Sequence, residues 1–587
     1  MTLEFQHAGA AKALPENYLP AALPAMMGQP VAETYPLLPA PVEGPAEDAA
    51  TEVLRAVTHA AGTALADPSQ VAAAMQDGLP RFIGPPMRPQ EDPLGDLAMA
   101  GEETDEGAVV TVLGLIDVGI AFWNPGFRTG GQSCFKDMGY LGFAGAGSGP
   151  GRSGVRFLGS AALDAICQQA DSDGHDRDIV ADLAAQYPQS VFGAHPVAGQ
   201  LYRIDGFNHG TAIADLMLNP QGDGARTVAP HRPIFGLDLP QDVLLDASGG
   251  TLQAVLPLAI RALARRVLDW GRQAHRGARL ELRLAVPFAF TGGGMGGTHP
   301  VIETIRQVVD RAARRRFAIK VFLPAGNHMQ DQLHARPGDP QAGTWSEPLR
   351  WFLPPDDHSP NTVEFTWQGG GSHVLEIDGP PGRAEVTLDH KQVALLREGG
   401  RVIGAAWCRD QGNGWTRLRI SLGPTASDLA SGLRLACGDW TLRVKPGAAI
   451  TDLGAWILRD DRMRLDRKSP PARQSRFRDT GYRRKDANGY VQKTDDPGSL
   501  VKRVGSISVL AAAQNADLVA VGAQERLAAG LTPAWYGGLS AQAGVPACHE
   551  VVDGLRPSSG IRALVNGGGR RMRFSGTSAA TALAAVR

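Results

Sequence analysis

Apolar residues between positions 107 and 345 follow two alternating patterns. Short runs rich in valine, isoleucine and leucine, such as Ala108–Ile116 and Ala318–Pro324, predict strands that are buried on both faces. Longer segments, such as Leu252–Ala274 and Pro300–Arg315, place their apolar residues at the spacing of an amphipathic helix. This alternation predicts an α/β unit in which helices flank a parallel sheet.

Residues 346–460 follow a different pattern, in which short alternating runs are separated by glycine, proline and aspartate. Such a pattern is typical of an antiparallel β-sandwich, which we expect to be inserted into the α/β unit. The α/β unit resumes over residues 503–587, where Val504–Ala512 and Leu518–Val521 predict paired strands. The predicted sandwich strands are Asn361–Trp367, His373–Ile377, Arg383–Leu388, Val402–Trp407, Trp415–Ser421, Trp440–Val444 and Ala455–Arg459.

Two further segments lack the pattern of a packed domain. Residues 1–106 are rich in proline and alanine, and they predict an N-terminal extension with a helical segment near Ala46–Gln76 and a linker. Residues 461–502 predict a basic loop or linker. A solvated loop is the simplest interpretation of its arginines; a surface for an acidic partner and a self-cleavage site are the alternatives.

Four polar side chains at the ends of predicted elements have the chemistry of nucleophilic catalysis. Asp117 and Asn327 each follow a predicted strand, whereas His209 and Ser578 each begin a predicted helix. A serine hydroxyl needs a base within hydrogen-bond reach and a third group that orients this base. We therefore predict Ser578 as the nucleophile, His209 as the base and Asp117 as the group that orients it.

Each of these motifs is weak evidence by itself, because Asp-x-Gly and Ala-Gly-Asn are ordinary turns and Gly-Thr-Ser is common in loops. Taken together, their types and their order along the chain resemble the subtilisin-like serine proteases, or subtilases. The four segments that carry the resemblance are Gly114–Ile120, Asn208–Ala214, Pro324–Asn327 and Phe574–Ala580.

The resemblance implies a serine endopeptidase that hydrolyses peptide bonds of a protein or peptide substrate. It gives Asn327 the task of stabilising the oxyanion, together with the backbone N–H of Ser578, and it requires no cofactor. It also implies that the strand near Leu280–Phe290 and the residues after it line the substrate site. These predicted substrate-binding residues are Thr291, Gly292, Gly293 and Gly294.

Metal and accessory features follow from the same resemblance. Subtilases often bind calcium, so a structural calcium ion is compatible with this family, although no ligand spacing in the sequence predicts a metal site. The strand Gly438–Val444 resembles a strand of the P-domain of proprotein convertases, which makes the predicted sandwich similar to that domain.

Three departures from the subtilase pattern keep other functions open. Val118 stands where the family usually has serine or threonine, and Ala582 stands where it usually has proline. The serine helix also stops at Arg587, which predicts either a truncated sequence or an unusually short end of the fold. The alternatives are a degenerate subtilase that binds peptides without cleaving them and a scaffold whose sandwich binds a partner.

Composition narrows the class of partner and compartment. The 587 residues carry a formal net charge of -2, so nothing in the overall charge favours nucleic acid or an anionic membrane. Hydrophobic residues make up 43% of the chain, and no apolar run reaches the length of a membrane span. The five scattered cysteines and the absence of a recognisable signal peptide predict a cytoplasmic protein, with export as the alternative. The oligomeric state is not predicted.

Overall fold

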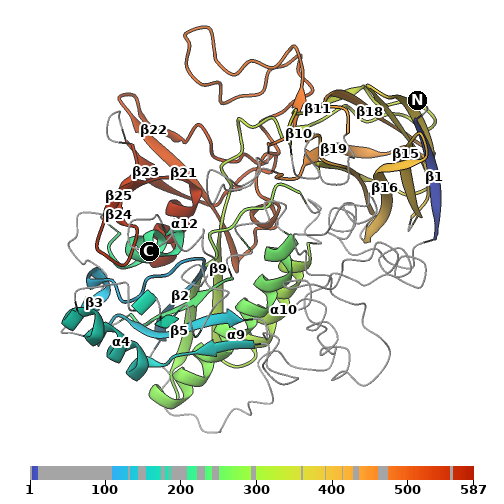
Figure 1. Ribbon diagram of the computed structural model, residues 1–587. Helices are drawn as coiled ribbons and strands as arrows, with labels where there is room; N and C mark the ends of the chain where they lie inside the picture. Colours follow the sequence, from blue (N-terminus) through green and yellow to red (C-terminus); the bar gives the residue numbers. More distant parts are fainter. Residues whose placement is uncertain are drawn as a thin grey trace.

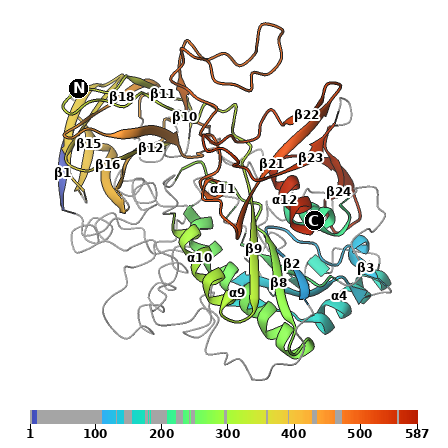
Figure 2. The ribbon, with the colours of Figure 1, turned by 180° about the vertical axis from the view of Figure 1, so that it is seen from behind.

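Two separate hydrophobic cores organise the computed structural model (Figure 1). The first packs around a nine-stranded sheet, and the second lies between the two sheets of a β-sandwich. The view from behind shows the same two lobes side by side (Figure 2). The structure describes residues 3–10, 109–129, 132–142, 154–173, 179–180, 182–183, 186, 208–220, 232–240, 243, 250–292, 299–357, 361–390, 392–412, 414–426, 435–460, 473–554 and 559–587.

The nine-stranded sheet of the α/β unit has a parallel centre and antiparallel edges. Neighbouring strands run parallel from β21 through β9, β8, β2 and β7 to β5, and β23 also runs parallel to β21. β22 and β6 pair antiparallel at the two ends. In sheet order the strands are β22 (Gly530–Pro533), β21 (Leu518–Leu527), β9 (Phe317–Pro324), β8 (Arg279–Ala285), β2 (Val109–Asp117), β7 (Ile234–Asp238), β5 (Phe135–Gly142) and β6 (Gly154–Phe157), with β23 (Cys548–Asp553) beside β21.

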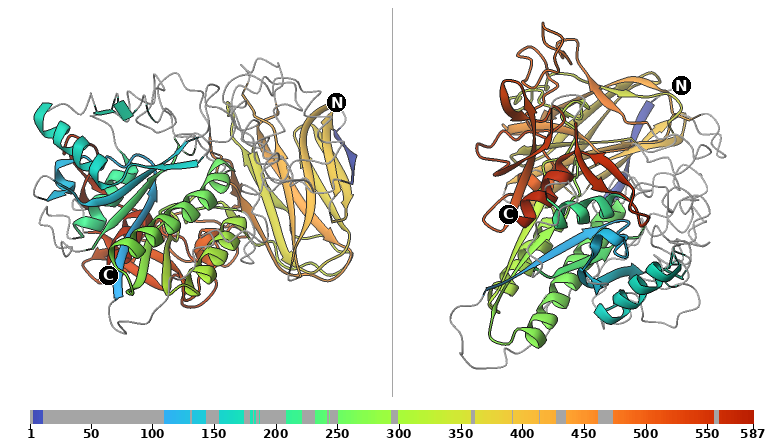
Figure 3. Two further views of the ribbon diagram at one scale, coloured as in Figure 1. Left: turned by 90° about the horizontal axis from the view of Figure 1, so that it is seen from below. Right: turned by 90° about the vertical axis from the view of Figure 1, so that its left-hand side faces the viewer.

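Helices cover both faces of this sheet (Figure 3). On one face α9 (Gly250–Ala274) and α10 (Pro300–Ala313) pack against each other and against the central strands. On the other face α7 (His209–Leu218) packs against α12 (Thr577–Val586). The predicted strands at β2 and β9 and the predicted helices at α9 and α10 are therefore confirmed. The strands are apolar because helices cover both faces of the sheet.

The remaining elements of the α/β unit are short, apart from α4 (Ser160–Asp173), which packs near β5. One prediction fails here: residues 504–512 do not form a strand. Only an isolated bridge at Val504 is present, and the last part of the segment is the short helix α11 (Val509–Ala512). A short apolar run has no periodicity that separates a strand from a buried helical turn. The other short elements are η1 (Pro125–Phe127), β3 (Arg128–Thr129), β4 (Gln132–Ser133), β24 (Ile561–Leu564) and β25 (Arg571–Phe574).

The β-sandwich consists of two antiparallel sheets whose inner faces share the second core. All seven strands predicted from the alternating runs are present, and β11 and β15 were not predicted. The seven-stranded sheet has the order β1 (Leu3–Ala10), β15 (Gln392–Glu398), β16 (Arg401–Gly412), β17 (Trp415–Leu422), β12 (Asn361–Gln368), β19 (Thr451–Ile457) and β10 (His334–Ala335). The five-stranded sheet has the order β14 (Gly382–Leu388), β13 (His373–Gly379), β18 (Gly438–Pro446), β11 (Leu349–Leu353) and β20 (Arg476–Arg478).

Three strands from outside residues 346–460 also join the sandwich. β1 pairs antiparallel with β15 at the edge of the larger sheet, β10 pairs with β19, and β20 pairs with β11. The helix expected near Ala46–Gln76 lies outside the described residues. No helix in the described ranges combines the length and the apolar character that crossing a membrane would require.

Candidate active site

Asp117 ends the central strand β2 and is completely buried. The loop that follows is held by a second carboxylate, because Asp238 at the end of the neighbouring strand β7 accepts hydrogen bonds from the backbone N–H groups of Gly119 and Ile120 at 2.9 and 3.4 Å. The carbonyl oxygen of Asp117 in turn accepts from the N–H of Leu239 at 2.8 Å. The carboxyl ends of two adjacent parallel strands thus fix the position of the Asp117 side chain.

His209 is the first residue of α7, and its Nδ1 lies 2.8 Å from each carboxylate oxygen of Asp117. The His209 side chain is 28% exposed, whereas that of Asp117 is 1% exposed. Burial opposes the charged imidazolium, but the charge of Asp117 and its hydrogen bond outweigh burial and raise the pKa of His209 above 6.5. The carboxylate therefore both orients the ring and stabilises its protonated form.

The start of α7 lies unusually close to the loop that carries Asp117. A Cβ atom at Gly210 would come within 2.7 Å of a side-chain atom of Ile120 and 3.0 Å of the carbonyl oxygen of Val118. The N–H groups of Gly210 and Thr211 donate to the carbonyl oxygens of Val118 and Gly119 at 2.9 and 3.0 Å. Only glycine at this position permits the approach that brings His209 to Asp117.

Asn327 follows β9, and its side chain is exposed and fixed from one side. Its Oδ1 accepts from the backbone N–H and the hydroxyl of Thr577 at 2.9 and 3.0 Å. The Thr577 hydroxyl oxygen also accepts from the N–H of Gly326 at 3.1 Å. Because the Oδ1 atom is held by Thr577, the N–H donors of the Asn327 amide are directed away from Thr577.

Ser578 is the second residue of α12 and is half-buried. Its hydroxyl donates to the main-chain carbonyl of Pro287 at 3.1 Å. The turn before it requires glycine, because Gly576 has a φ of 112° and a Cβ atom there would lie 3.3 Å from Nδ2 of Asn327. The turn therefore places the beginning of α12 directly against the Asn327 side chain.

A buried tyrosine anchors the same turn. The hydroxyl of Tyr536 accepts from the N–H of Gly576 at 3.0 Å and donates to the carboxylate of Asp553 at 2.5 Å. Burial and the contact with Asp553 raise the pKa of Tyr536 far above its usual range, so the phenol stays protonated. This hydrogen-bonded chain connects the end of β23 to the turn that precedes Ser578.

The structure brings the four predicted polar segments together. The ring of Phe574, just before the Ser578 turn, packs edge-on against the His209 ring with centroids 5.6 Å apart. α7 and α12 also pack along each other. His209 contacts Asp117, and Asn327 contacts the residue before Ser578. The Ser578 hydroxyl itself points to Pro287 in this conformation.

The serine helix α12 is short, and its surroundings stabilise it. Ala582 is completely buried at the position where the family pattern has proline. At the other end, Arg232 donates to the carbonyl oxygen of Val586 at 2.6 Å, and Arg283 donates to that of Ala585 at 2.7 Å. Cations at the carboxyl end of a helix satisfy its last carbonyls and oppose its dipole.

The predicted substrate-binding segment contacts the sandwich. The Thr291 hydroxyl oxygen accepts from the N–H of Arg459 at 2.8 Å. Gly292 is buried, and a Cβ atom there would lie 2.5 Å from a side-chain atom of Leu458 and 2.9 Å from a carboxylate oxygen of Glu364. The sandwich therefore packs directly on this segment. Gly293 and Gly294 lie outside the described residues.

The residues that position the site were not predicted from the sequence. Thr577 holds the Asn327 side chain, Asp238 holds the loop after Asp117, and Tyr536 and Asp553 hold the turn before Ser578. Asp238 offered one usable signal, because it follows an apolar run just as Asp117 does. Thr577 belongs to the segment Phe574–Ala580 that carries the resemblance, but nothing local marks it as the partner of Asn327. Nothing local marks Tyr536 and Asp553 as partners of each other either.

Comparisons with known proteins agree with the fold described above. No family model matches the sequence, and no curated protein matches it. Among solved structures, the chain is similar to the CspB protease of Clostridium perfringens, with a TM-score of 0.51 and 13% sequence identity over 81% of this chain and 80% of that chain. At this identity the likeness is one of fold, and the fold is one that a protease uses.

Proposed function

We propose that this protein is a subtilisin-like serine endopeptidase with an inserted β-sandwich. One observation carries the proposal: the buried Asp117 carboxylate holds Nδ1 of a partly exposed histidine, at 2.8 Å, beside the helix that carries Ser578 in its first turn. A buried acid that orients an imidazole next to a serine at a helix start is the arrangement that serine hydrolases need.

The proposed reaction begins when the Ser578 hydroxyl turns from Pro287 toward His209. The hydroxyl oxygen attacks the peptide carbonyl carbon while His209 accepts the proton, and Asp117 stabilises the resulting imidazolium. The amide of Asn327 and the N–H of Ser578 would hold the oxyanion. His209 then gives the proton to the leaving amine, and water releases the acyl group from Ser578 by the same steps.

Orientation of Asn327 is an additional argument for this role. Because Thr577 occupies Oδ1 of Asn327, the amide does not need to reorganise when charge develops on the substrate oxygen. Donors that are fixed before the reaction stabilise a transition state more effectively than donors that must first be ordered.

The test is labelling of Ser578 with a fluorophosphonate, followed by hydrolysis of an unfolded protein substrate. We expect wild type to be labelled at Ser578, and Ser578→Ala to lose both labelling and hydrolysis while it keeps its circular dichroism spectrum. Ser540→Ala is the matched control, because Ser540 lies in a loop and its hydroxyl oxygen accepts from the N–H of Gln542. Hydrolysis that survives in Ser578→Ala would refute the proposal.

A second candidate function follows from the hydrogen bond between Ser578 and the carbonyl oxygen of Pro287. If that bond persists when peptide is bound, the protein is a degenerate subtilase that binds peptides without cleaving them. Wild type would then bind a peptide by calorimetry as tightly as Ser578→Ala does, with no labelling of either protein. Labelling of wild type excludes this candidate.

A further inference from the structure

Three side chains that commonly bind metal ions meet in the β-sandwich. They are His373, His390 and Cys408, and one ligand atom from each lies within 4.8 Å of the others. His373 begins β13 in the five-stranded sheet, and Cys408 belongs to β16 in the seven-stranded sheet. His390 lies in the connection from β14 to β15, which joins the two sheets. The cluster thus draws one group from each sheet and one from the segment between them.

His373 lacks the partners that a buried imidazole needs. The residue is 1% exposed, and among the described residues neither of its ring nitrogens has a hydrogen-bond partner. Its ring is edge-on to Trp367, with centroids 4.6 Å apart, which supplies packing but satisfies neither nitrogen. Buried polar groups are almost always paired, so two unsatisfied nitrogens on one ring indicate a missing partner.

The hydrogen bonds around His390 leave one of its ring nitrogens for a ligand. Thr416 donates its hydroxyl proton to the carbonyl oxygen of Gly369 at 2.6 Å. At its 3.3 Å contact with Nε2 of His390, the Thr416 oxygen must therefore accept, so Nε2 donates and Nδ1 is the nitrogen left to bind a metal.

That arrangement has the form of a metal ligand with its supporting hydrogen bond. A histidine that binds a metal through one nitrogen usually donates the other N–H to a nearby oxygen, here that of Thr416. Two imidazoles and one thiolate favour zinc over the harder cations calcium and magnesium, which prefer oxygen. Zinc–ligand bonds of about 2.0–2.3 Å place tetrahedral ligand atoms about 3.3–3.8 Å apart, so small side-chain rotations close the cluster.

We propose that His373, His390 and Cys408 bind a zinc ion that ties the two sheets of the sandwich together. His390 is half-buried, whereas His373 and Cys408 are buried, so a metal ion would enter the cluster from the side of His390. Binding would replace the Cys408 thiol proton and give one of the two unsatisfied nitrogens of His373 a partner. The site is independent of the proposed peptidase chemistry, because none of its three residues belongs to the α/β unit.

The test uses the full-length chain with Ser578→Ala, so that self-digestion cannot change the result. The protein is stripped with a chelator under reducing conditions, loaded with zinc sulfate, desalted and analysed for metal by mass spectrometry. We expect one zinc per chain. His390→Ala is the first variant, because a half-buried loop residue tolerates truncation, and we expect it to weaken zinc binding by at least about tenfold. Cys408→Ala should do the same.

Cys437→Ala is the matched control, since Cys437 is a half-buried cysteine near β18 in the same sandwich and is not part of the cluster. It should keep one zinc per chain. Cobalt(II) supplies a second measurement that uses wild type alone and does not depend on the folding of any variant: the wild-type complex should show the near-ultraviolet charge-transfer band of a cobalt–thiolate bond.

Three results would overturn the proposal. One is a stripped and reduced protein that takes up no zinc, which would mean that water fills the space beside His373. Another is zinc binding that is equal in wild type, His390→Ala and Cys408→Ala. The last is cobalt binding to wild type without a thiolate band. Fluorophosphonate labelling of the chain with Ser578 intact tests the proposed peptidase separately. Failure of one proposal therefore leaves the other measurable.

Discussion

The charged side chains of the two units differ in solvent exposure. Asp117 and His209 form the pair in the α/β unit, and Glu364, Arg417 and Arg419 form the cluster in the sandwich. In the α/β unit a completely buried carboxylate leads to a histidine whose side chain is 28% exposed. In the sandwich Glu364, Arg417 and Arg419 are at most 1% exposed. Arg419 Nε lies 2.6 Å from Glu364, and both guanidinium groups lie 5.3 Å from the centre of the Trp407 ring.

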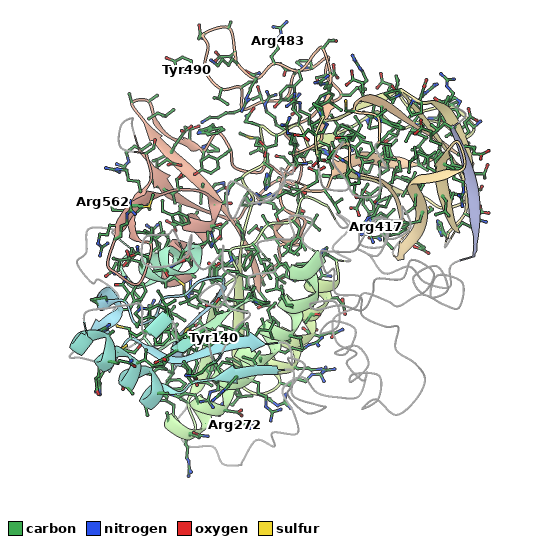
Figure 4. All side chains as sticks on the ribbon, in the orientation of Figure 1. Tyr140, Arg272, Arg417, Arg483, Tyr490 and Arg562 are labelled. Carbon is green, nitrogen blue, oxygen red and sulfur yellow. The ribbon has the colours of Figure 1, made fainter. Side chains whose placement is uncertain are left out.

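The difference follows from the way each sheet is built. Parallel strands end at a common edge, where polar groups remain accessible to a ligand while their supports stay buried. In the sandwich, Glu364 and Arg419 lie opposite each other on β12 and β17, on the face away from the core, and Glu364 approaches Gly292 of the α/β unit. Figure 4 shows Arg417 within the sandwich, whereas Arg483 and Tyr490 lie on an outer loop. A buried carboxylate beside a partly exposed histidine is suited to catalysis, because the histidine can reach a substrate. A fully buried charged cluster is suited to holding the two units together.

The largest effect is expected for Asp117→Asn. The change keeps the size of the side chain but removes the charge that orients and stabilises His209, so kcat should fall by about 10⁴ with little loss of stability. Asp331→Asn is the matched control, because Asp331 contacts Nδ1 of His328 at 2.8 Å in an exposed pair. Steady-state kinetics on a peptide substrate decides this point. If kcat fell equally in both variants, the buried pair of Asp117 and His209 would have no catalytic role that the exposed pair of Asp331 and His328 lacks.

Glu364→Gln should produce the next largest effect, on stability. It leaves two buried arginines without their shared anion, which costs about 3–5 kcal/mol in the free energy of unfolding. Asp439→Asn weakens the more exposed pairs with Arg350 and Arg478 and should cost no more than about 1 kcal/mol. Urea denaturation measures both values. The comparison fails if the buried and the exposed variants lose the same amount.

Asn327→Ala tests the exposed part of the proposed active site. Removing the amide should lower kcat by about 10²–10³ and leave KM nearly unchanged, because the amide is proposed to act only when charge develops. The backbone N–H of Thr577, which donates a hydrogen bond to Oδ1 of Asn327, would then need another acceptor. An increase in KM with unchanged kcat would instead assign Asn327 to substrate binding.

Tyr536→Phe tests the buried support of the site. The change removes the acceptor of the Gly576 N–H and the donor to Asp553, so unfolding free energy should fall by about 1–3 kcal/mol. Because the Ser578 turn loses its anchor, kcat should fall as well, while labelling by fluorophosphonate slows in proportion. A stable variant with a wild-type labelling rate would show that the tyrosine does not position the turn.

The smallest effect concerns pH. The proposed base works only when neutral, and Asp117 raises the pKa of His209 above 6.5 despite burial. Activity should therefore be complete well above this pKa and decline as pH falls through it, with a midpoint of kcat/KM above pH 6.5. A pH–rate profile of wild type measures the midpoint. A midpoint below 6.5 would mean that burial, rather than Asp117, dominates the environment of His209.

The local pattern of the sequence was enough to predict the main elements of both units. The buried runs at β2 and β9, the amphipathic helices α9 and α10, and seven strands of the sandwich follow from periodicity alone. The same pattern failed at residues 504–512, where a short apolar run ends in α11 instead of pairing as a strand. β1 was also missed, because its pairing with β15 joins segments separated by most of the chain.

The sequence by itself determined which residue types stand at the ends of strands and helices, since Asp117, His209, Asn327 and Ser578 each follow or begin a locally encoded element. Only the tertiary structure decided which of these groups touch and what supports them. Asp238 holds the Asp117 loop, Tyr536 anchors the Ser578 turn, and the three side chains of the proposed zinc site come from two strands and a connection. The local periodicity of apolar residues shows which residues of a helix or strand face the core. Contacts between distant segments depend on packing that no single segment encodes.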